Sequence, residues 1–203
     1  MNKLAIIVFG LGVIGAGACK KKGGGGGGGE ASGTGLAIDA AAVNSLVPAP
    51  LKDKLVFEKR DIVLERGRDN TTYTLAAPKG WTQGMKSFGS LEAPKDSGMG
   101  FFTKFSVGSN CDGECKPKEW EKIADKVNFS GKGKVLKDVK GKGTRLMISE
   151  SEGGMDTTEV VFAWWTDGAD NYHTCQATLD KEIKDAAPAF EKACMAVTVS
   201  GDD

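Results

Sequence analysis

The chain has 203 residues, with 27 basic side chains, 27 acidic side chains and one histidine, so its formal net charge at neutral pH is zero. This balance argues against a dedicated nucleic-acid binder, because such proteins need a basic surface that neutralises phosphates. The length is enough for one domain of about 150 residues with a substantial core, plus terminal segments.

The first 18 residues have the pattern of a secretory signal peptide. Lys3 precedes an apolar run over 4–14, and small residues fill 15–18 before Cys19. The apolar run is shorter than the roughly 20 residues that span a bilayer, and small residues suit the pocket of a signal peptidase. We therefore predict that residues 1–18 are removed from the mature protein.

The end of this segment resembles the lipobox of bacterial lipoproteins, in which the cysteine becomes the first mature residue and carries a diacylglycerol. Ala16 stands where that family usually has leucine. The resemblance implies acyl chains such as palmitate on Cys19, and two or three chains would hold the protein on a membrane permanently, since each buried methylene contributes about 0.8 kcal/mol. Lys20 resembles the residue that follows the anchor in lipoproteins of the outer membrane. The alternative is a secreted protein that is cleaved near Ala18.

Residues 19–50 are predicted to be a linker. Three lysines and seven glycines follow Cys19, and a glycine-rich coil of about sixteen residues reaches roughly 20 to 25 Å. Asp39 can cap a short helix that ends before Pro48. A single α+β domain is expected over 51–203.

Strands are predicted where runs rich in β-branched and aromatic residues lie between turn residues. These runs cover 55–64 (with a charged turn), 71–76, 86–91, 100–107, 134–140, 144–149, 159–165 and 172–177. The run 159–165 is apolar on both faces, which is typical of a central strand. Leu146 and Ile148 should point inward from the hairpin over 134–149. Because side chains alternate along a strand, Phe101 should share a face with Phe105 and Val107, and Phe102 should point the other way.

Two helices are expected against this sheet. Trp120, Ile123, Ala124 and Val127 form one apolar stripe in Pro117–Val127. A second helix, Pro188–Met195, is expected to begin with Asp185 as its cap and with Pro188 in the first turn.

Four cysteines remain besides Cys19, namely Cys111, Cys115, Cys175 and Cys194. An even number in an exported protein predicts two disulfides, and four cysteines allow three pairings. We favour Cys111 with Cys115 across a short turn, and Cys175 with Cys194 between a strand and the last helix. The alternative is zinc held by Cys111, Cys115 and His173, but their spacing lacks the usual paired ligands, so we predict no metal and no cofactor.

The segment 132–145 has the strongest charge asymmetry of the domain. It carries six cations against Asp138, namely Lys132, Lys134, Lys137, Lys140, Lys142 and Arg145. From this set, we single out Lys134, Lys137, Lys140, Lys142 and Arg145 as candidates for binding an anionic glycan, a lipid head group or an acidic envelope protein. The alternative is a solvated hairpin whose lysines keep an edge strand from pairing with other chains.

No catalytic residue is predicted. His173 is the only histidine, and the sequence contains no Gly-x-Ser-x-Gly elbow. Two acidic groups could hold calcium, but neither has the spacing of a known loop. They are Glu150, Glu152, Asp156 and Glu159, and then Asp167, Asp170 and Asn171.

The stretch from Tyr73 to Trp81, Tyr-Thr-Leu-Ala-Ala-Pro-Lys-Gly-Trp, resembles an element of PsbP-like domains. The resemblance covers residues 54–200 and implies an α/β/α sandwich, in which helices cover a central antiparallel sheet. Independently of the resemblance, Trp81 follows the turn over 78–80, and a tryptophan at such a position is expected to close one end of a sheet. The family includes an extrinsic subunit of photosystem II, a Ran-binding protein and bacterial lipoproteins of unknown role, and none of their contact residues can be transferred here.

Together these features predict a lipid-anchored protein of the bacterial cell envelope, on the outer membrane and facing either the periplasm or the cell surface. We expect a non-enzymatic module that binds or supports another envelope component, with no nucleic-acid partner. The alternative is an envelope hydrolase or a thiol redox enzyme that uses His173 or a Cys111/Cys115 pair.

Overall fold

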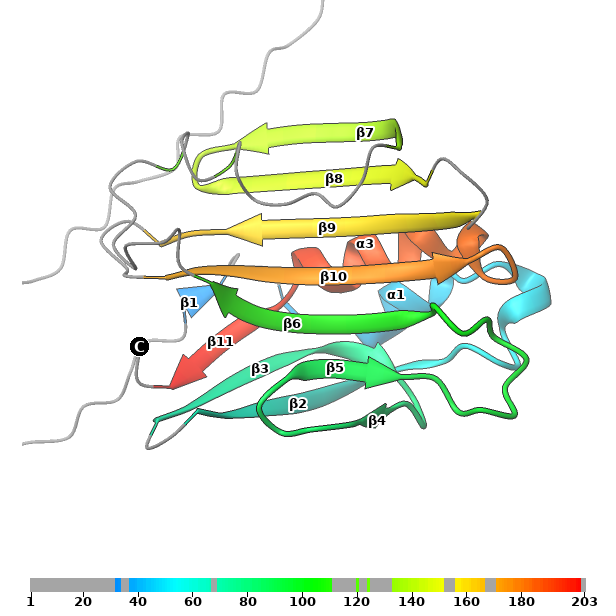
Figure 1. Ribbon diagram of the computed structural model, residues 1–203, viewed down its shortest axis with the longest axis horizontal. Helices are drawn as coiled ribbons and strands as arrows, with labels where there is room; N and C mark the ends of the chain where they lie inside the picture. The colour runs from blue at the N-terminus through cyan, green and yellow to red at the C-terminus, as the bar shows by residue number, and fades with distance from the viewer. Residues whose placement is uncertain are drawn as a thin grey trace, which may run out of the picture.

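The computed structural model describes residues 32–33, 37–66, 69–110, 120, 124, 133–151, 156–166 and 171–201. Over these ranges the chain forms mostly β-strands, with the helices α1 and α3 and two short 3-10 helices (Figure 1). Trp120 and Ala124 are helical as well.

The strands of the described ranges belong to two sheets, and every pair of neighbouring strands is antiparallel. The small sheet consists, in spatial order, of β1 (Ser32–Gly33), β11 (Thr198–Gly201), β3 (Asp69–Pro78) and β2 (Phe57–Arg66). The large sheet consists of β4 (Thr82–Gln83), β5 (Gly89–Glu92), β6 (Lys104–Asn110), β10 (Tyr172–Asp180), β9 (Thr157–Trp164), β8 (Thr144–Glu150) and β7 (Lys134–Gly141). The helical elements are α1 (Ala40–Ser45), η1 (Ala49–Leu51), η2 (Lys184–Ala186) and α3 (Ala187–Met195).

The predicted fold class, an α+β sandwich with one central sheet covered by helices, is therefore wrong. The β2–β3 hairpin does not join the large sheet, because β3 pairs instead with the C-terminal strand β11. The alternation of side chains in a strand specifies which residues point inward. It does not specify which sheet the strand joins, since that depends on partners far away along the chain.

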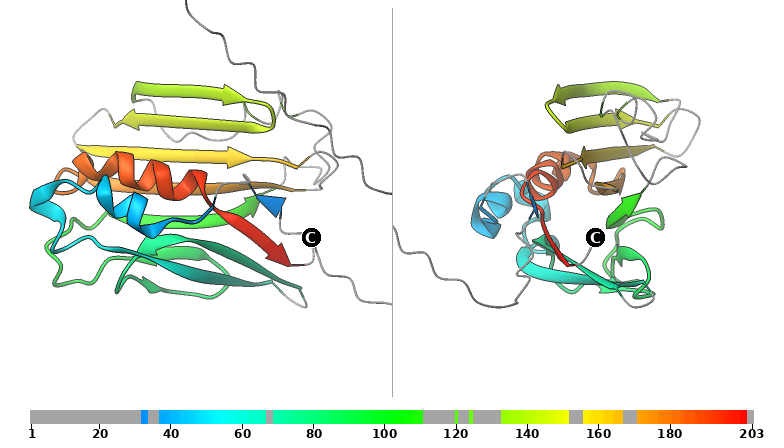
Figure 2. Two further views of the ribbon diagram at one scale, coloured as in Figure 1. Left: turned by 180° about the vertical axis from the view of Figure 1, so that it is seen from behind. Right: turned by 90° about the vertical axis from the view of Figure 1, so that its left-hand side faces the viewer.

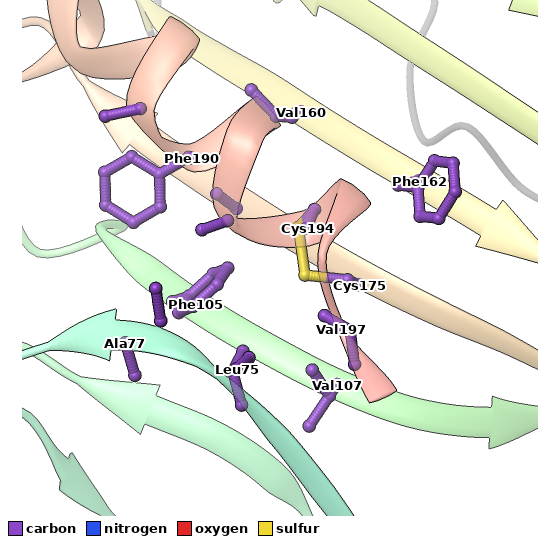
Figure 3. Packing of buried hydrophobic residues seen from close by; sticks show 14 of the residues in the cluster. Leu75, Ala77, Phe105, Val107, Val160, Phe162, Cys175, Phe190, Cys194 and Val197 are labelled. Carbon is purple, nitrogen blue, oxygen red and sulfur yellow. A yellow bond between two sulfur atoms is a disulfide. The ribbon is translucent and has the colours of Figure 1, made fainter. Parts of the chain in front are cut away.

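The two sheets and α3 enclose one hydrophobic core. Figure 2 shows α3 lying along β9 and β10 with α1 beside it, while the small sheet lies below them. In Figure 3, Phe190 of α3 points toward Phe105 of β6. The ring of Phe190 lies 5.1 Å from that of Phe57 and 5.3 Å from that of Phe105, in edge-to-face geometry. Trp81 also packs against Phe190, at 6.0 Å, and is buried as the sequence predicts.

The structure contains the predicted disulfide between Cys175 and Cys194. Both cysteines are fully buried, and the bond joins β10 to α3 in the middle of the core (Figure 3). Cys111 and Cys115 lie outside the described residues, so their pairing stays a prediction.

Helix α1 belongs to the folded domain. The side chain of Asp39 accepts a hydrogen bond from the Ala42 amide at 3.0 Å, as expected for its cap. The side chain of Asn44 exchanges two hydrogen bonds with the backbone of Phe57, at 2.7 and 2.8 Å. Because Val43 is buried in the common core, the packed part of the chain includes residues before Leu51.

Three local predictions differ from the structure. No turn interrupts β2, because Glu58 and Asp61 continue the pairing with β3 while their charged side chains stay exposed. Asp185 lies in η2 and does not cap α3, whose N-cap is Ala186 without a side-chain hydrogen bond. Phe101 precedes β6 in a turn, so it does not share the buried face of Phe105.

The central position of β9 and the hairpin of β7 and β8 are as predicted. Strand β9 lies between β8 and β10 and is almost entirely buried. Leu146 and Ile148 are buried in the core. Trp120 and Ala124 pack against Ala163 on the other face of the sheet, and the remaining residues of the predicted helix Pro117–Val127 lie outside the described ranges. Among the described helices, none is long and apolar enough to cross a membrane.

Reduction of the Cys175–Cys194 bond should lower the free energy of unfolding by about 3 kcal/mol, because a closed loop of about 20 residues restricts the unfolded chain. For a chain of this size the melting temperature should fall by roughly 6 to 12 °C. The measurement is thermal and urea unfolding of the full chain with and without a reductant. A Cys111→Ala/Cys115→Ala variant is the control and should keep this loss on reduction. A Cys175→Ala/Cys194→Ala variant that is as stable as the oxidised wild type would contradict the assignment.

Candidate functional site

Strand β7 is the outermost strand of the large sheet, and all eight of its residues are exposed. One backbone edge pairs with β8, and no described strand pairs with the other. Its cationic side chains are those of Lys134, Lys137 and Lys140, and Lys142 follows in the turn to β8. Its apolar side chains are about half exposed, namely Val135, Leu136 and Val139. We call these seven residues the basic edge.

Arg145 is not part of this exposed surface, although the sequence groups it with the lysines. It is only 8% exposed, and its Nε and Nη2 atoms donate to the two carboxylate oxygens of Asp138 at 3.1 Å each. Its Nη1 atom donates to the carbonyl of Ala124. The guanidinium therefore joins β7 to β8 and to a helical residue on the face of the large sheet opposite α3. The hydrogen bonds from Arg145 hold the pKa of Asp138 below its ordinary value.

Lys137 connects the basic edge to the rest of the fold. Its Nζ atom lies 2.6 Å from Oε1 of Glu191 on α3, while Asp138 points to the opposite face of the sheet. The bulge between Val135 and Lys137 changes the alternation of β7, so apolar and cationic side chains occur on both of its faces. A ligand of the basic edge would meet both kinds of side chain at once.

His173 is 1% exposed and lies in the core between the two sheets. Its Nδ1 atom lies 3.0 Å from the hydroxyl of Tyr73 on β3. Its ring stacks on Trp164 at 5.3 Å, and Trp164 stacks in turn on Phe162 at 5.5 Å. The arrangement links β3 to β9 and β10 through aromatic packing. Cys175, two residues further along β10, is oxidised and so offers no thiol beside this ring.

The indole Nε1 of Trp164 is buried and has no hydrogen-bond partner in the described part of the chain. An unpaired buried N–H costs about 1 to 3 kcal/mol.

The described members of the two acidic groups do not form a cluster that could hold a metal ion. Asp156 is exposed and lies 3.5 Å from Lys184, whereas Glu150 and Glu159 belong to the strands β8 and β9. Glu152, Asp167 and Asp170 lie outside the described ranges. Across the described residues, no group of three histidine, cysteine or acidic side chains is arranged to hold a metal ion.

Sequence reasoning missed one exposed aromatic site, the loop from β5 to β6 that we call the aromatic loop (residues 93–103). Phe101 is 92% exposed and Phe102 is 43% exposed. Two signals could have indicated this loop. Gly98 and Gly100 flank Met99 and favour a turn, and two adjacent phenylalanines cannot both point into one core.

No protein-family model matches this sequence, and no curated protein is similar enough to count as a relative. The resemblance to PsbP-like domains thus gains no support, and the sandwich that it implies differs from the observed fold. The resemblance of the N-terminal segment to lipoproteins stays a prediction.

Replacing Asp138 by asparagine should lower the free energy of unfolding by about 1 to 2 kcal/mol at neutral pH, because the buried Arg145 loses its anionic partner. We expect the lower part of the usual range for a charged hydrogen bond, since the Asp138 side chain is 32% exposed. Asp53→Asn, in an exposed turn, is the matched control and should be neutral.

The same pair should show a defined pH dependence. The folded-state pKa of Asp138 lies below its ordinary value of 3.8, so the stabilisation is complete above that pH and is lost as the pH falls through the lowered pKa. Urea unfolding from neutral to strongly acidic pH should therefore show wild type and Asp138→Asn converging in acid. If the difference in free energy of unfolding between the two proteins stayed constant over the whole pH range, the ionised Asp138 would not be the source of the stabilisation.

Proposed function

We propose that this protein is a lipid-anchored module of the bacterial cell envelope that binds another envelope component through the basic edge. The anchor is inferred from the sequence before Cys19, and the binding surface from β7. The observation that carries the proposal is the composition of this outermost strand, which exposes lysines and large apolar side chains together.

A purely protective role explains only part of this composition. Lysines on an edge strand discourage pairing with other chains. That role does not account for Val135, Leu136 and Val139, which each leave about half of their surface in water. A group of exposed apolar side chains is instead typical of a surface that another molecule covers.

The chemistry of the partner follows from this surface. An extended acidic segment of a protein could add a strand along β7, with main-chain hydrogen bonds giving affinity and carboxylates lying near Lys134, Lys140 and Lys142. Apolar side chains at alternate positions of that segment would cover the exposed valines and leucine. Anionic glycan would use the lysines but leave the apolar side chains uncovered, so we favour an acidic protein segment.

The positions of His173 and Cys175 are consistent with a binding role. The imidazole is enclosed and bonded to Tyr73, and the Cys175 thiol is part of a disulfide. The alternative of an envelope hydrolase or a thiol redox enzyme that uses His173 or a Cys111/Cys115 pair stays a hypothesis. A count of free thiols in the exported protein tests its redox form.

Substitution of Cys19 by serine should remove the lipid anchor. Cells labelled with a palmitate analogue should incorporate it into the wild-type chain and not into Cys19→Ser, and the variant should leave the membrane fraction. Cys111→Ser is the control and should still be labelled. Equal labelling of wild type and Cys19→Ser would contradict the anchor.

Charge reversal of the basic edge should weaken partner binding at least tenfold, because three exposed ion pairs contribute about 0.5 to 1 kcal/mol each. The variant is Lys134→Glu/Lys140→Glu/Lys142→Glu, which leaves the Lys137–Glu191 pair intact. The measurement is cross-linking of the full lipoprotein in its own envelope, followed by capture and identification of the cross-linked chain.

The matched control reverses three exposed lysines outside the large sheet, Lys52, Lys59 and Lys79. We expect this control to capture the same partner as wild type. Retention of the partner by the basic-edge variant, or equal loss in both variants, would show that β7 is a solvated edge and not the binding surface.

A further inference from the structure

The aromatic loop has a fixed backbone. Asp180 at the end of β10 is buried, and its Oδ2 atom accepts hydrogen bonds from the Phe102 amide at 2.9 Å and from the Thr103 hydroxyl at 3.2 Å. A Cβ atom on Gly100 would lie 2.0 Å from the same Oδ2, so only glycine fits there. Gly98 has a φ of +69°, a conformation that other residues rarely adopt. The buried carboxylate and the two glycines therefore favour this conformation of residues 98–103.

This fixed conformation holds Phe101 in water. Its ring packs only edge-to-face on that of Phe102, with centroids 5.4 Å apart, and 92% of the residue is exposed. Burial of a phenylalanine side chain is worth about 1.5 to 3 kcal/mol, which this position forgoes. The arrangement contributes nothing visible to the core, and it preserves an aromatic surface for contact with another molecule.

A cavity of about 580 Å³ lies beside Phe101, between the aromatic loop and the adjoining ends of β5 and β6. Its volume is in the range typical of small-molecule sites. The apolar part of its wall comes from Ala93, Pro94, Met99 and Phe101, and the charged part from Lys95, Lys104 and Glu92. Neither Lys95 nor Lys104 forms an ion pair with a described residue, so both ammonium groups can meet a ligand.

A second cavity that Phe101 also lines has the other electrostatic sign. Its volume is about 280 Å³, and Asp156, Asp180 and Glu182 line it against one lysine, Lys181. An anion is therefore favoured in the cavity of Lys95 and Lys104 and disfavoured in this second cavity.

We infer that the larger cavity binds a small amphipathic anion. An aromatic or short acyl group would lie on Phe101 and Met99, and a carboxylate or sulfonate would lie near Lys95 and Lys104. This site is separate from the basic edge, and its occupation requires neither the lipid anchor nor the envelope partner.

The position of the loop favours a soluble ligand over the anchoring membrane. The aromatic loop connects β5 to β6 at the end of the molecule opposite β1 and the C-terminal label (Figures 1 and 2). Strand β1 is the first described element after Cys19 along the chain. A molecule attached through that end would present Phe101 away from the point of attachment.

The test uses 1-anilinonaphthalene-8-sulfonate, an aryl sulfonate whose fluorescence rises in apolar surroundings, with the full folded chain. We expect saturable binding that Phe101→Ala weakens at least tenfold. Phe88→Ala, which removes another exposed phenylalanine, is the matched control and should bind as wild type does. Lys95→Gln/Lys104→Gln should weaken binding several-fold at low salt, and Lys52→Gln/Lys79→Gln should not.

Two further measurements locate the site and distinguish a soluble ligand from a membrane lipid. Dodecanoate should displace the probe, while dodecanol should displace it less, because the alcohol has no charge for the two lysines. Amide chemical shifts on titration with the probe should change within residues 92–104. Equal binding by Phe101→Ala and Phe88→Ala, or shifts confined to other segments, would overturn the proposal. So would Phe101-dependent binding to anionic phospholipid vesicles with no displacement by dodecanoate, which would identify a membrane contact instead.

Discussion

Phe190 occupies the place where helix α3 meets both sheets, and the rest of the structure depends on the contacts of its ring. The rings of Phe57, in the small sheet, and Phe105, in the large sheet, both pack edge-to-face against the ring of Phe190. Trp81 packs against the same ring. One turn later the helix is bonded to β10 through Cys194. Hydrophobic packing thus brings the sheets together, and the covalent bond keeps α3 in the position that this packing requires.

The interior and the periphery of the molecule have different chemistry. Two interior polar groups have partners, since His173 pairs with Tyr73 and Arg145 pairs with Asp138. These contacts stabilise the packing of sheets and helices. The desolvation penalty of leaving one buried partner unpaired would be larger than the net free energy gained from the pair. The two surfaces that we propose for binding lie at the margins of the large sheet, on β7 and on the aromatic loop. A rigid scaffold that presents its binding groups on edges and loops is typical of binding domains.

Local sequence patterns predicted many of the helices and strands. The errors arose where contacts between distant parts of the chain determine which sheet a strand joins or whether a side chain is exposed. Apolar residues on both faces of 159–165 correctly indicated a central strand, and Asp39 correctly indicated a helix start. The division into two sheets could not be predicted, because β3 pairs with β11, more than a hundred residues away along the chain. Arg145 was grouped with the lysines because charge alone does not report burial. Phe101 was placed in a strand because its exposure depends on Asp180, a residue far from it in the sequence.

The two-residue strand β1 also determines how the molecule would respond to force. It pairs only with β11, through Ser32 and Gly33, whereas α1 behind it is held by Asn44 and by Val43 in the core. Tension on the chain before Ser32 would load this short pair first, and its few hydrogen bonds would open one after another. Once this pair opened, the chain between Ser32 and Asp39 would add to the length of the attachment. The tension would then act on α1. With the anchor that we propose, movement of the envelope would stretch the attachment while β7 and the aromatic loop keep their shape.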